Sequence, residues 1–190
     1  MKEKQKQSLT KLCTCAILMA LSTVLSIIPI WQMPLGGKIT LLSMLPICSI
    51  AVLYGVKAAI LPCFLYGTLQ VFLGGVFGWG LSLKVLIGCI LLDYIFAYTA
   101  MCLSGVFRNK GPFGITAGVA VAVFVRFICH FLSGFILWAN FDVFNNPYVY
   151  SLCYNGAYML PELVLTAVGA YLLSATSAYK RIIKIAANKK

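Results

Sequence analysis

Four ionisable residues interrupt the long apolar runs of this chain: Asp93, Arg126, His130 and Glu162. Arg126 and the only histidine, His130, are four residues apart and therefore lie on one side of a helix. Trp138 continues this side at the same spacing. Charged and imidazole side chains are costly in hydrocarbon and usually face a cavity or a partner. The spacing therefore predicts a small-molecule pocket at the end of a membrane helix.

The residues around this cluster suit a flat, nitrogen-containing cation. Asp93 would pair with a ligand cation or amino group, and aromatic faces attract cations by roughly 0.5–2 kcal/mol. Neutral His130 and the amide of Asn155 each offer a donor and an acceptor, which suits the edge of a pyrimidine. The predicted ligand contacts are Trp31, Asp93, His130, Trp138, Tyr150, Tyr154 and Asn155. No residue is assigned a catalytic role.

Structural explanations compete with these roles. Arg126 would neutralise Asp93 or Glu162 between helices, because membrane charges tend to pair. Trp31 and Trp138 would be aromatic residues of the membrane interface. Tyr150 and Asn155 would cap the last membrane helix, since asparagine is a good N-cap.

The composition indicates an integral membrane protein. Of 190 residues, 62% are hydrophobic and only 10% are charged, and the mean hydropathy is +0.96. No soluble core of this size would hide so much apolar surface. Long apolar runs without two-residue alternation favour helices over a membrane barrel. The eight cysteines form no metal-type set and are interpreted as small buried apolar residues, and no cofactor is expected.

The chain is predicted to be one all-α membrane domain with six transmembrane helices. The expected spans cover residues 12–30, 39–54, 58–76, 81–107, 113–139 and 155–177. Six spans place both termini on one side. The tails and the turns near residues 57 and 108–110 hold twelve of the fifteen Lys and Arg residues, whereas the opposite side holds only Lys38 and Lys84. By the positive-inside rule both termini are cytoplasmic, and nucleic-acid binding is not expected.

The first expected helix carries a pair of small residues. Ala16 and Ala20 are four residues apart, and such a pair allows another helix to approach closely. The pattern fits either a contact within the chain or a surface for a partner subunit.

Several motifs together resemble the thiamine-specific substrate-binding (S) components of energy-coupling factor (ECF) vitamin transporters, the ThiT type. The more specific ones are His-Phe-x-x-Gly from His130 and Tyr-Ser-x-x-x-Asn-Gly from Tyr150. Pro34-Leu-Gly-Gly-Lys, Leu92-Asp-Tyr and Trp138 occur in the same order as in that family.

The resemblance implies a six-helix protein of the bacterial cell membrane that captures extracellular thiamine and has no enzymatic activity. It implies ligand contacts at Asp93, His130, Trp138, Tyr150 and Asn155. It also implies that Ala16 and Ala20 dock on a transmembrane coupling subunit, which works with two cytoplasmic ATPases. Some relatives carry an acid in or near the first outer loop, where this chain has none, and Thr40 and Ser43 are the candidate substitutes.

Three other readings compete with this one. An S component for another vitamin or precursor, such as a hydroxymethylpyrimidine, would use a similar pocket. A stand-alone secondary transporter would need no ATPase, but the inverted repeats of many such proteins are not visible. A membrane enzyme is disfavoured because no nucleophile, metal set or phosphate-binding motif accompanies His130. With only Lys38 and Lys84 near the outer loops, we expect free thiamine to be preferred over its diphosphate.

Overall fold

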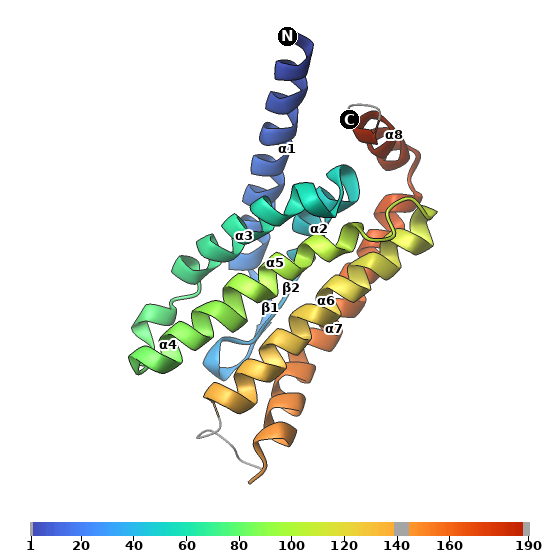
Figure 1. Ribbon diagram of the computed structural model, residues 1–190. Coiled ribbons are helices and arrows are strands. Elements are labelled where there is room, and N and C mark those ends of the chain that lie inside the picture. The colour runs from blue at the N-terminus through green and yellow to red at the C-terminus, as the bar shows by residue number, and fades with distance from the viewer. Residues whose placement is uncertain (1, 139–144, 188–190) are drawn as a thin grey trace.

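The computed structural model describes residues 2–138 and 145–187, and it is an all-helical bundle apart from one short hairpin (Figure 1). Within these residues, five helical segments are long and apolar enough to cross a membrane. They are 5–27, 56–78, 83–105, 111–137 and 147–175, and a shorter apolar helix covers 44–54. The predicted all-α membrane fold is confirmed, while the count of six spans and the cytoplasmic termini stay predictions.

The elements follow one another in a simple order. They are α1 (Lys2–Ile27), β1 (Pro29–Gln32), η1 (Pro34–Gly36), β2 (Lys38–Thr40), α2 (Met44–Tyr54), α3 (Val56–Leu73), η2 (Val76–Gly78), α4 (Leu83–Cys89), η3 (Ile90–Phe96), α5 (Ala97–Thr99), η4 (Ala100–Gly105), α6 (Gly111–Leu137), α7 (Pro147–Ala175) and α8 (Ser177–Ala187). The four elements from α4 to η4 form one continuous rod beside α6 (Figure 1).

Small residues bring the helices of the core close together. A Cβ added to Gly105 of η4 would lie 2.5 Å from the carbonyl oxygen of Ala51 in α2. One added to Gly118 of α6 would lie 2.5 Å from the carbonyl oxygen of Ser104. These approaches bury Ile47, Cys48, Met101, Val119 and Val123 in one cluster. Close backbone packing of this kind is the usual way in which helices associate in lipid, where no hydrophobic effect drives them together.

The first outer connection differs from the expected loop and helix start. β1 and β2 pair as an antiparallel hairpin, with Trp31 opposite Ile39. Residues 38–43, which the sequence placed largely in the second span, are strand and turn, and α2 begins only at Met44. The β-branched Ile39 and Thr40 favour a strand. Leu42 has a left-handed backbone conformation, at φ 61°, so the chain turns there before α2 begins.

The last long helix begins earlier than expected. α7 starts at Pro147, and the side chain of Asn146 caps it by accepting hydrogen bonds from the backbone N of Tyr148 (3.1 Å) and Val149 (3.3 Å). Proline at the first helical position fits such a start. The alternative that Tyr150 and Asn155 cap this helix is therefore wrong, because both lie within it. Residues 139–144 of the expected loop lie outside the described residues.

The two ends of the bundle differ. The start of α1 and the basic amphipathic helix α8 lie at one end (Figure 1). The hairpin turn, the start of α4, the end of α6 and the start of α7 lie at the other end (Figure 1). All eight cysteines are free, but Cys13 and Cys153 are exposed, so the expected burial is wrong for these two.

Candidate functional site

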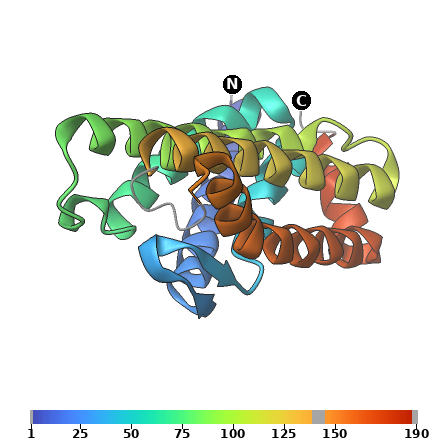
Figure 2. The same cartoon turned by 90° about the horizontal axis from the view of Figure 1, so that it is seen from below.

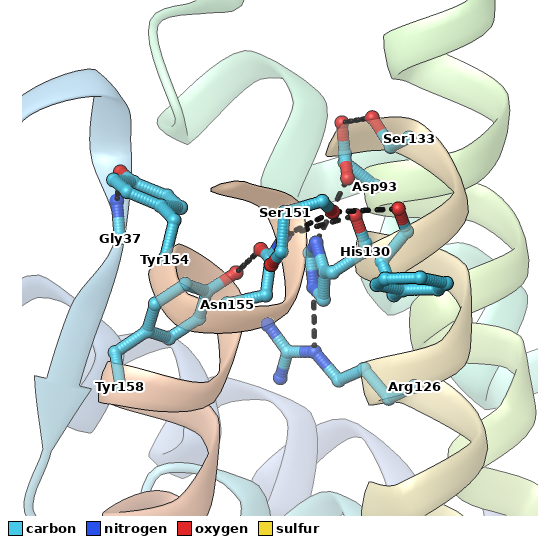
Figure 3. Close-up of polar contacts among 10 residues, drawn as sticks. Gly37, Asp93, Arg126, His130, Ser133, Ser151, Tyr154, Asn155 and Tyr158 are labelled. Atoms are coloured by element: carbon cyan, nitrogen blue, oxygen red, sulfur yellow. Dashed lines mark hydrogen bonds and ion pairs between the residues drawn. The ribbon is translucent and has the colours of Figure 1, made fainter. Parts of the chain in front are cut away.

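A cavity of about 600 Å³ opens between the hairpin, η3, α6 and α7. This volume lies within the range of small-molecule pockets, about 300–1,000 Å³. The view from below shows the hairpin lying beside α7 (Figure 2). The polar side chains of the cavity wall point toward one another across α6 and α7 (Figure 3).

Two helical stripes form one side of this cavity, and we call them together the α6–α7 wall. On each helix most of the cavity-lining residues recur every four positions, which places them on one face, and Ser133 and Asn155 lie beside these stripes. The stripes are Arg126, His130 and Gly134 on α6 with Trp138 directly after it, and Tyr150, Tyr154, Tyr158 and Glu162 on α7. Gly134 allows the helices to meet, because a Cβ there would collide with Ser151 Oγ and lie 2.9 Å from Asn155 Nδ2.

Asp93 reaches the wall from η3, a π-helical turn in the rod. Its Oδ1 lies 2.8 Å from His130 Nδ1, and its Oδ2 accepts a hydrogen bond of 2.5 Å from Ser133 Oγ. Single π-turns inside helices often occur at functional sites, where they redirect a side chain. The carboxylate is thus held on both oxygens by α6 while it still lines the cavity.

The contacts of Arg126 differ from the expected ones, which were an ion pair with Asp93 or Glu162. Its Nε donates to His130 Nε2 at 3.2 Å, and its guanidinium carbon lies 4.1 Å from the centre of the Tyr98 ring. In the described part of the chain it makes no ion pair with Asp93 or Glu162 within 4.0 Å. The charge is therefore stabilised by an aromatic face and an imidazole.

Asn155 joins the two helices of the wall. Its Nδ2 donates to the carbonyl oxygens of His130 (3.2 Å) and Ser151 (3.0 Å), and its Oδ1 accepts from the hydroxyl of Tyr158 at 2.9 Å. These bonds already use the polar atoms that the sequence assigned to a ligand ring. Its direct contact with a ligand stays a prediction.

Aromatic side chains also line the cavity. Trp138 meets Trp79 edge to face, with ring centres 5.8 Å apart, and Tyr150 stacks on Tyr154 at 5.8 Å. Trp31 does not line the cavity and is 51% exposed. The structure thus brings together six of the seven predicted contacts and leaves Trp31 outside.

Several lining residues were not singled out as ligand contacts from the sequence. They are Trp79, Tyr94, Tyr98, Ser133 and Tyr158. Tyr94 and Ser133 could have been predicted, since they belong to the sequence motifs that contain Asp93 and His130. Trp79 lies in a glycine-rich segment without periodicity, so no pattern pointed to it.

The hairpin covers the cavity and is fastened to α7 at two places. At its tip, the hydroxyl of Tyr154 donates to the carbonyl oxygen of Pro34 and accepts from the backbone N of Gly37 at 3.1 Å. At its base, Glu162 Oε1 accepts hydrogen bonds from the backbone N of Thr40 and from Thr40 Oγ1, the latter at 2.6 Å. Thr40 Oγ1 also lies 2.6 Å from Ser43 Oγ. The two candidate substitutes for a loop acid therefore sit beside a buried acid from α7.

Comparison with known proteins agrees with this architecture. A family model described as thiamine transporter protein (Thia_YuaJ) matches residues 12–182. The chain is 30% identical to the thiamine transporter ThiT of Bacillus subtilis (strain 168), over 91% of this chain and 94% of that protein.

The chain belongs to the thiamine transporter family. Family membership and the long apolar helices make it a multi-pass protein of the bacterial membrane. A ThiT of Lacticaseibacillus paracasei is also 30% identical, over 66% of this chain and 67% of that protein. The solved structure of ThiT from Listeria monocytogenes shares the fold, with a TM-score of 0.75 at 24% identity over 93% of this chain and 98% of that chain.

Ala16 and Ala20, the pair expected to dock a partner, are both exposed on α1. The opposite side of α1 packs against the core through Cys15, Leu18 and Met19. The face with the two alanines also carries exposed Leu12, Ile17 and Val24. It is therefore open to lipid or to another helix.

Proposed function

We propose that this chain binds thiamine in the cavity and serves as the substrate-binding subunit of an ECF-type transporter. The observation that carries the proposal is the composition of the cavity in a member of the thiamine transporter family. It combines a buried carboxylate with aromatic faces. Thiamine combines a permanent thiazolium charge with a flat aminopyrimidine, so each part of the ligand has a complementary surface.

The charges of the cavity favour a cationic ligand. Asp93 and Glu162 both line it, and Arg126 is a buried cation that lines it as well. Lys38 lies at the hairpin, partly exposed. Away from the hairpin, the cavity thus holds two acids and one arginine, so a cation meets one unbalanced negative charge there when both acids are ionised. A diphosphate would meet few cationic groups, which supports the expected preference for free thiamine.

Transport would follow from closing and docking. Thiamine enters while the hairpin stands away from the wall, and the hairpin then closes over it. The loaded protein engages a transmembrane coupling subunit through the face of α1 that carries Ala16 and Ala20, and two cytoplasmic ATPases supply the energy. This coupling separates the proposal from a stand-alone secondary transporter, which would take up thiamine without an ATPase.

The binding step can be tested by titrating thiamine into the detergent-purified protein and following tryptophan fluorescence. Trp79 and Trp138 line the cavity whereas Trp31 does not. We therefore expect saturable quenching that persists in Trp31→Phe and weakens in Trp138→Phe. A folded protein that is quenched by hydroxymethylpyrimidine but not by thiamine would assign the cavity to a precursor instead.

The docking step can be tested with Ala16→Trp. A large side chain at this exposed position would block the close approach of a partner helix. We expect thiamine uptake by cells to be abolished while the purified variant binds thiamine as the wild type does. Thr14→Trp is the matched control, because Thr14 lies on another side of α1. Loss of binding in Ala16→Trp would mean that this face supports the fold.

A further inference from the structure

A continuous chain of polar contacts crosses the cavity wall from Arg126 to Ser133 (Figure 3). Arg126 Nε lies 3.2 Å from His130 Nε2, and His130 Nδ1 lies 2.8 Å from Asp93 Oδ1. Ser133 Oγ closes the chain on Asp93 Oδ2 at 2.5 Å. Both ring nitrogens of the histidine are therefore engaged within the protein.

The chemistry of Arg126 fixes the direction of this chain. A guanidinium carries only donors and stays charged in proteins. His130 Nε2 must therefore accept, so it carries no proton. The ring proton then lies on Nδ1 and is donated to Asp93. The contacts select one neutral tautomer of His130.

The other groups around His130 agree with a neutral ring. From α7, Tyr158 meets the imidazole edge to face, with centres 6.0 Å apart, and Glu162 lines the same cavity. From α5, Tyr98 holds the guanidinium of Arg126. Asp93, from η3, is the carboxylate in contact with the ring, and Lys38 of the hairpin also lines the cavity. Asp93 would attract a second proton to the ring, whereas the positive charge of Arg126 opposes it.

We propose that Arg126 is a positioning residue that holds His130 as the neutral Nδ1–H tautomer and so keeps the charge of Asp93 free for a cationic ligand. This inference rests on the proposed function, since it explains how a cation is accepted beside a histidine. Without Arg126, the ring takes up a second proton in mild acid. The resulting imidazolium neutralises Asp93 and repels the ligand.

The single histidine makes the tautomer directly measurable. In protein labelled with ¹⁵N-histidine, the imidazole spectrum reports which nitrogen carries a proton. We expect the wild type to show protonated Nδ1 and bare Nε2 from about pH 7.5 down to about pH 5.5, where an ordinary histidine, titrating near pH 6.5, is mostly charged. A proton on Nε2 in this range would overturn the inference. Since no ligand is added, this result is independent of whether thiamine binds.

Three substitutions separate the charge of Arg126 from its hydrogen bond. Arg126→Lys keeps both the charge and a donor, Arg126→Gln keeps a donor without the charge, and Arg126→Met keeps neither. We expect the histidine to remain neutral in the Lys variant and to become doubly protonated at about pH 5.5 in the Met variant, with the Gln variant between them. If Arg126→Met does not fold, the Lys and Gln variants still provide the comparison.

Thiamine binding should follow the same order. In Arg126→Met, we expect the dissociation constant to rise about tenfold between about pH 7.5 and about pH 5.5, as for competition with one proton at an ordinary histidine. It should stay nearly constant in the wild type and in Arg126→Lys. Arg108→Met is the matched control, because Arg108 bonds the carbonyl oxygens of Val52 and Leu53 away from the cavity. Equal pH profiles in all variants would reject the role of Arg126 while leaving thiamine binding intact.

Discussion

The α6–α7 wall and the β1–β2 hairpin enclose the same cavity but are held in different ways. The wall is tied together by its own polar groups: Asn155 bonds the backbone of both helices, and Ser151 Oγ donates to the carbonyl oxygen of Phe131 at 2.7 Å. The hairpin has two strands of four and three residues and is fastened to α7 through Tyr154 and Glu162. The wall is therefore formed before a ligand arrives, whereas the position of the hairpin depends on a few contacts.

This difference assigns separate tasks to the two regions. A preformed wall lowers the cost of binding, because its side chains are already ordered. A lightly fastened cover allows entry and exit, since few bonds must break to move it. Substitutions in the wall should therefore change affinity or stability, and substitutions at the hairpin contacts should change rates.

Removing the charge of Asp93, which is held against the wall by His130 and Ser133, should lower thiamine affinity more than any other substitution considered. Asp93→Asn keeps the size of the side chain but loses the attraction to a cation. We expect thiamine affinity to fall roughly a hundredfold, about 3 kcal/mol, as for loss of a buried hydrogen bond to a charged group. Isothermal titration would measure it, and Glu162→Gln, at the other acid that lines the cavity, would show how much of the effect belongs to Asp93 alone. An unchanged dissociation constant would remove Asp93 from the ligand site.

Closing the space at Gly134 tests whether the wall must be tightly packed. In Gly134→Ala the new Cβ would collide with Ser151 Oγ and lie 2.8 Å from Ser151 Cβ. Overpacking of this kind costs about 1–3 kcal/mol, so we expect a lower unfolding temperature and weaker binding together.

Gly156 provides the matched control for that substitution. It lies on α7, and a Cβ added there would meet no atom within 4 Å. Gly156→Ala should therefore leave stability and binding unchanged or slightly improved, because alanine favours a helix over glycine. Equal losses in the two variants would show that the contact with Ser151 does not decide the outcome.

The sequence predicted the wall better than the hairpin, for physical reasons. Helical periodicity placed His130 and Trp138 on one face, and the structure keeps them there. The matching stripe on α7 was missed because the helix start was placed near residue 155. Asn146 followed by Pro147 is a start signal that would have placed Tyr150 and Tyr154 on the helix.

Local patterns could not supply the contacts that depend on several elements. Trp31 was expected in the site because of its residue type, yet neighbouring residues of a strand point in opposite directions. Gln32 lines the cavity, and Trp31 faces away from it. The partner of Arg126 was also misjudged, because Tyr98 approaches it from a different helix. The rule that charges pair in a membrane predicts a carboxylate as the partner of Arg126, and it does not predict an aromatic ring.

The smallest expected effect comes from loosening the hairpin tip. Tyr154→Phe removes the hydroxyl that bonds Pro34 and Gly37 while keeping the ring that stacks on Tyr150. A hydrogen bond of this kind contributes about 1 kcal/mol, so we expect thiamine to dissociate about fivefold faster with little change in the association rate. Stopped-flow tryptophan fluorescence would measure both rates.

Tyr148→Phe is the control for that measurement, since Tyr148 lies on the same helix but is exposed and does not line the cavity. It should leave both rates unchanged. A lower unfolding temperature in Tyr154→Phe with an unchanged dissociation rate would show that the hydroxyl of Tyr154 stabilises the fold without holding the ligand in place. A faster dissociation rate at constant stability would instead establish that α7 holds the hairpin over the ligand, because only the cover would have changed.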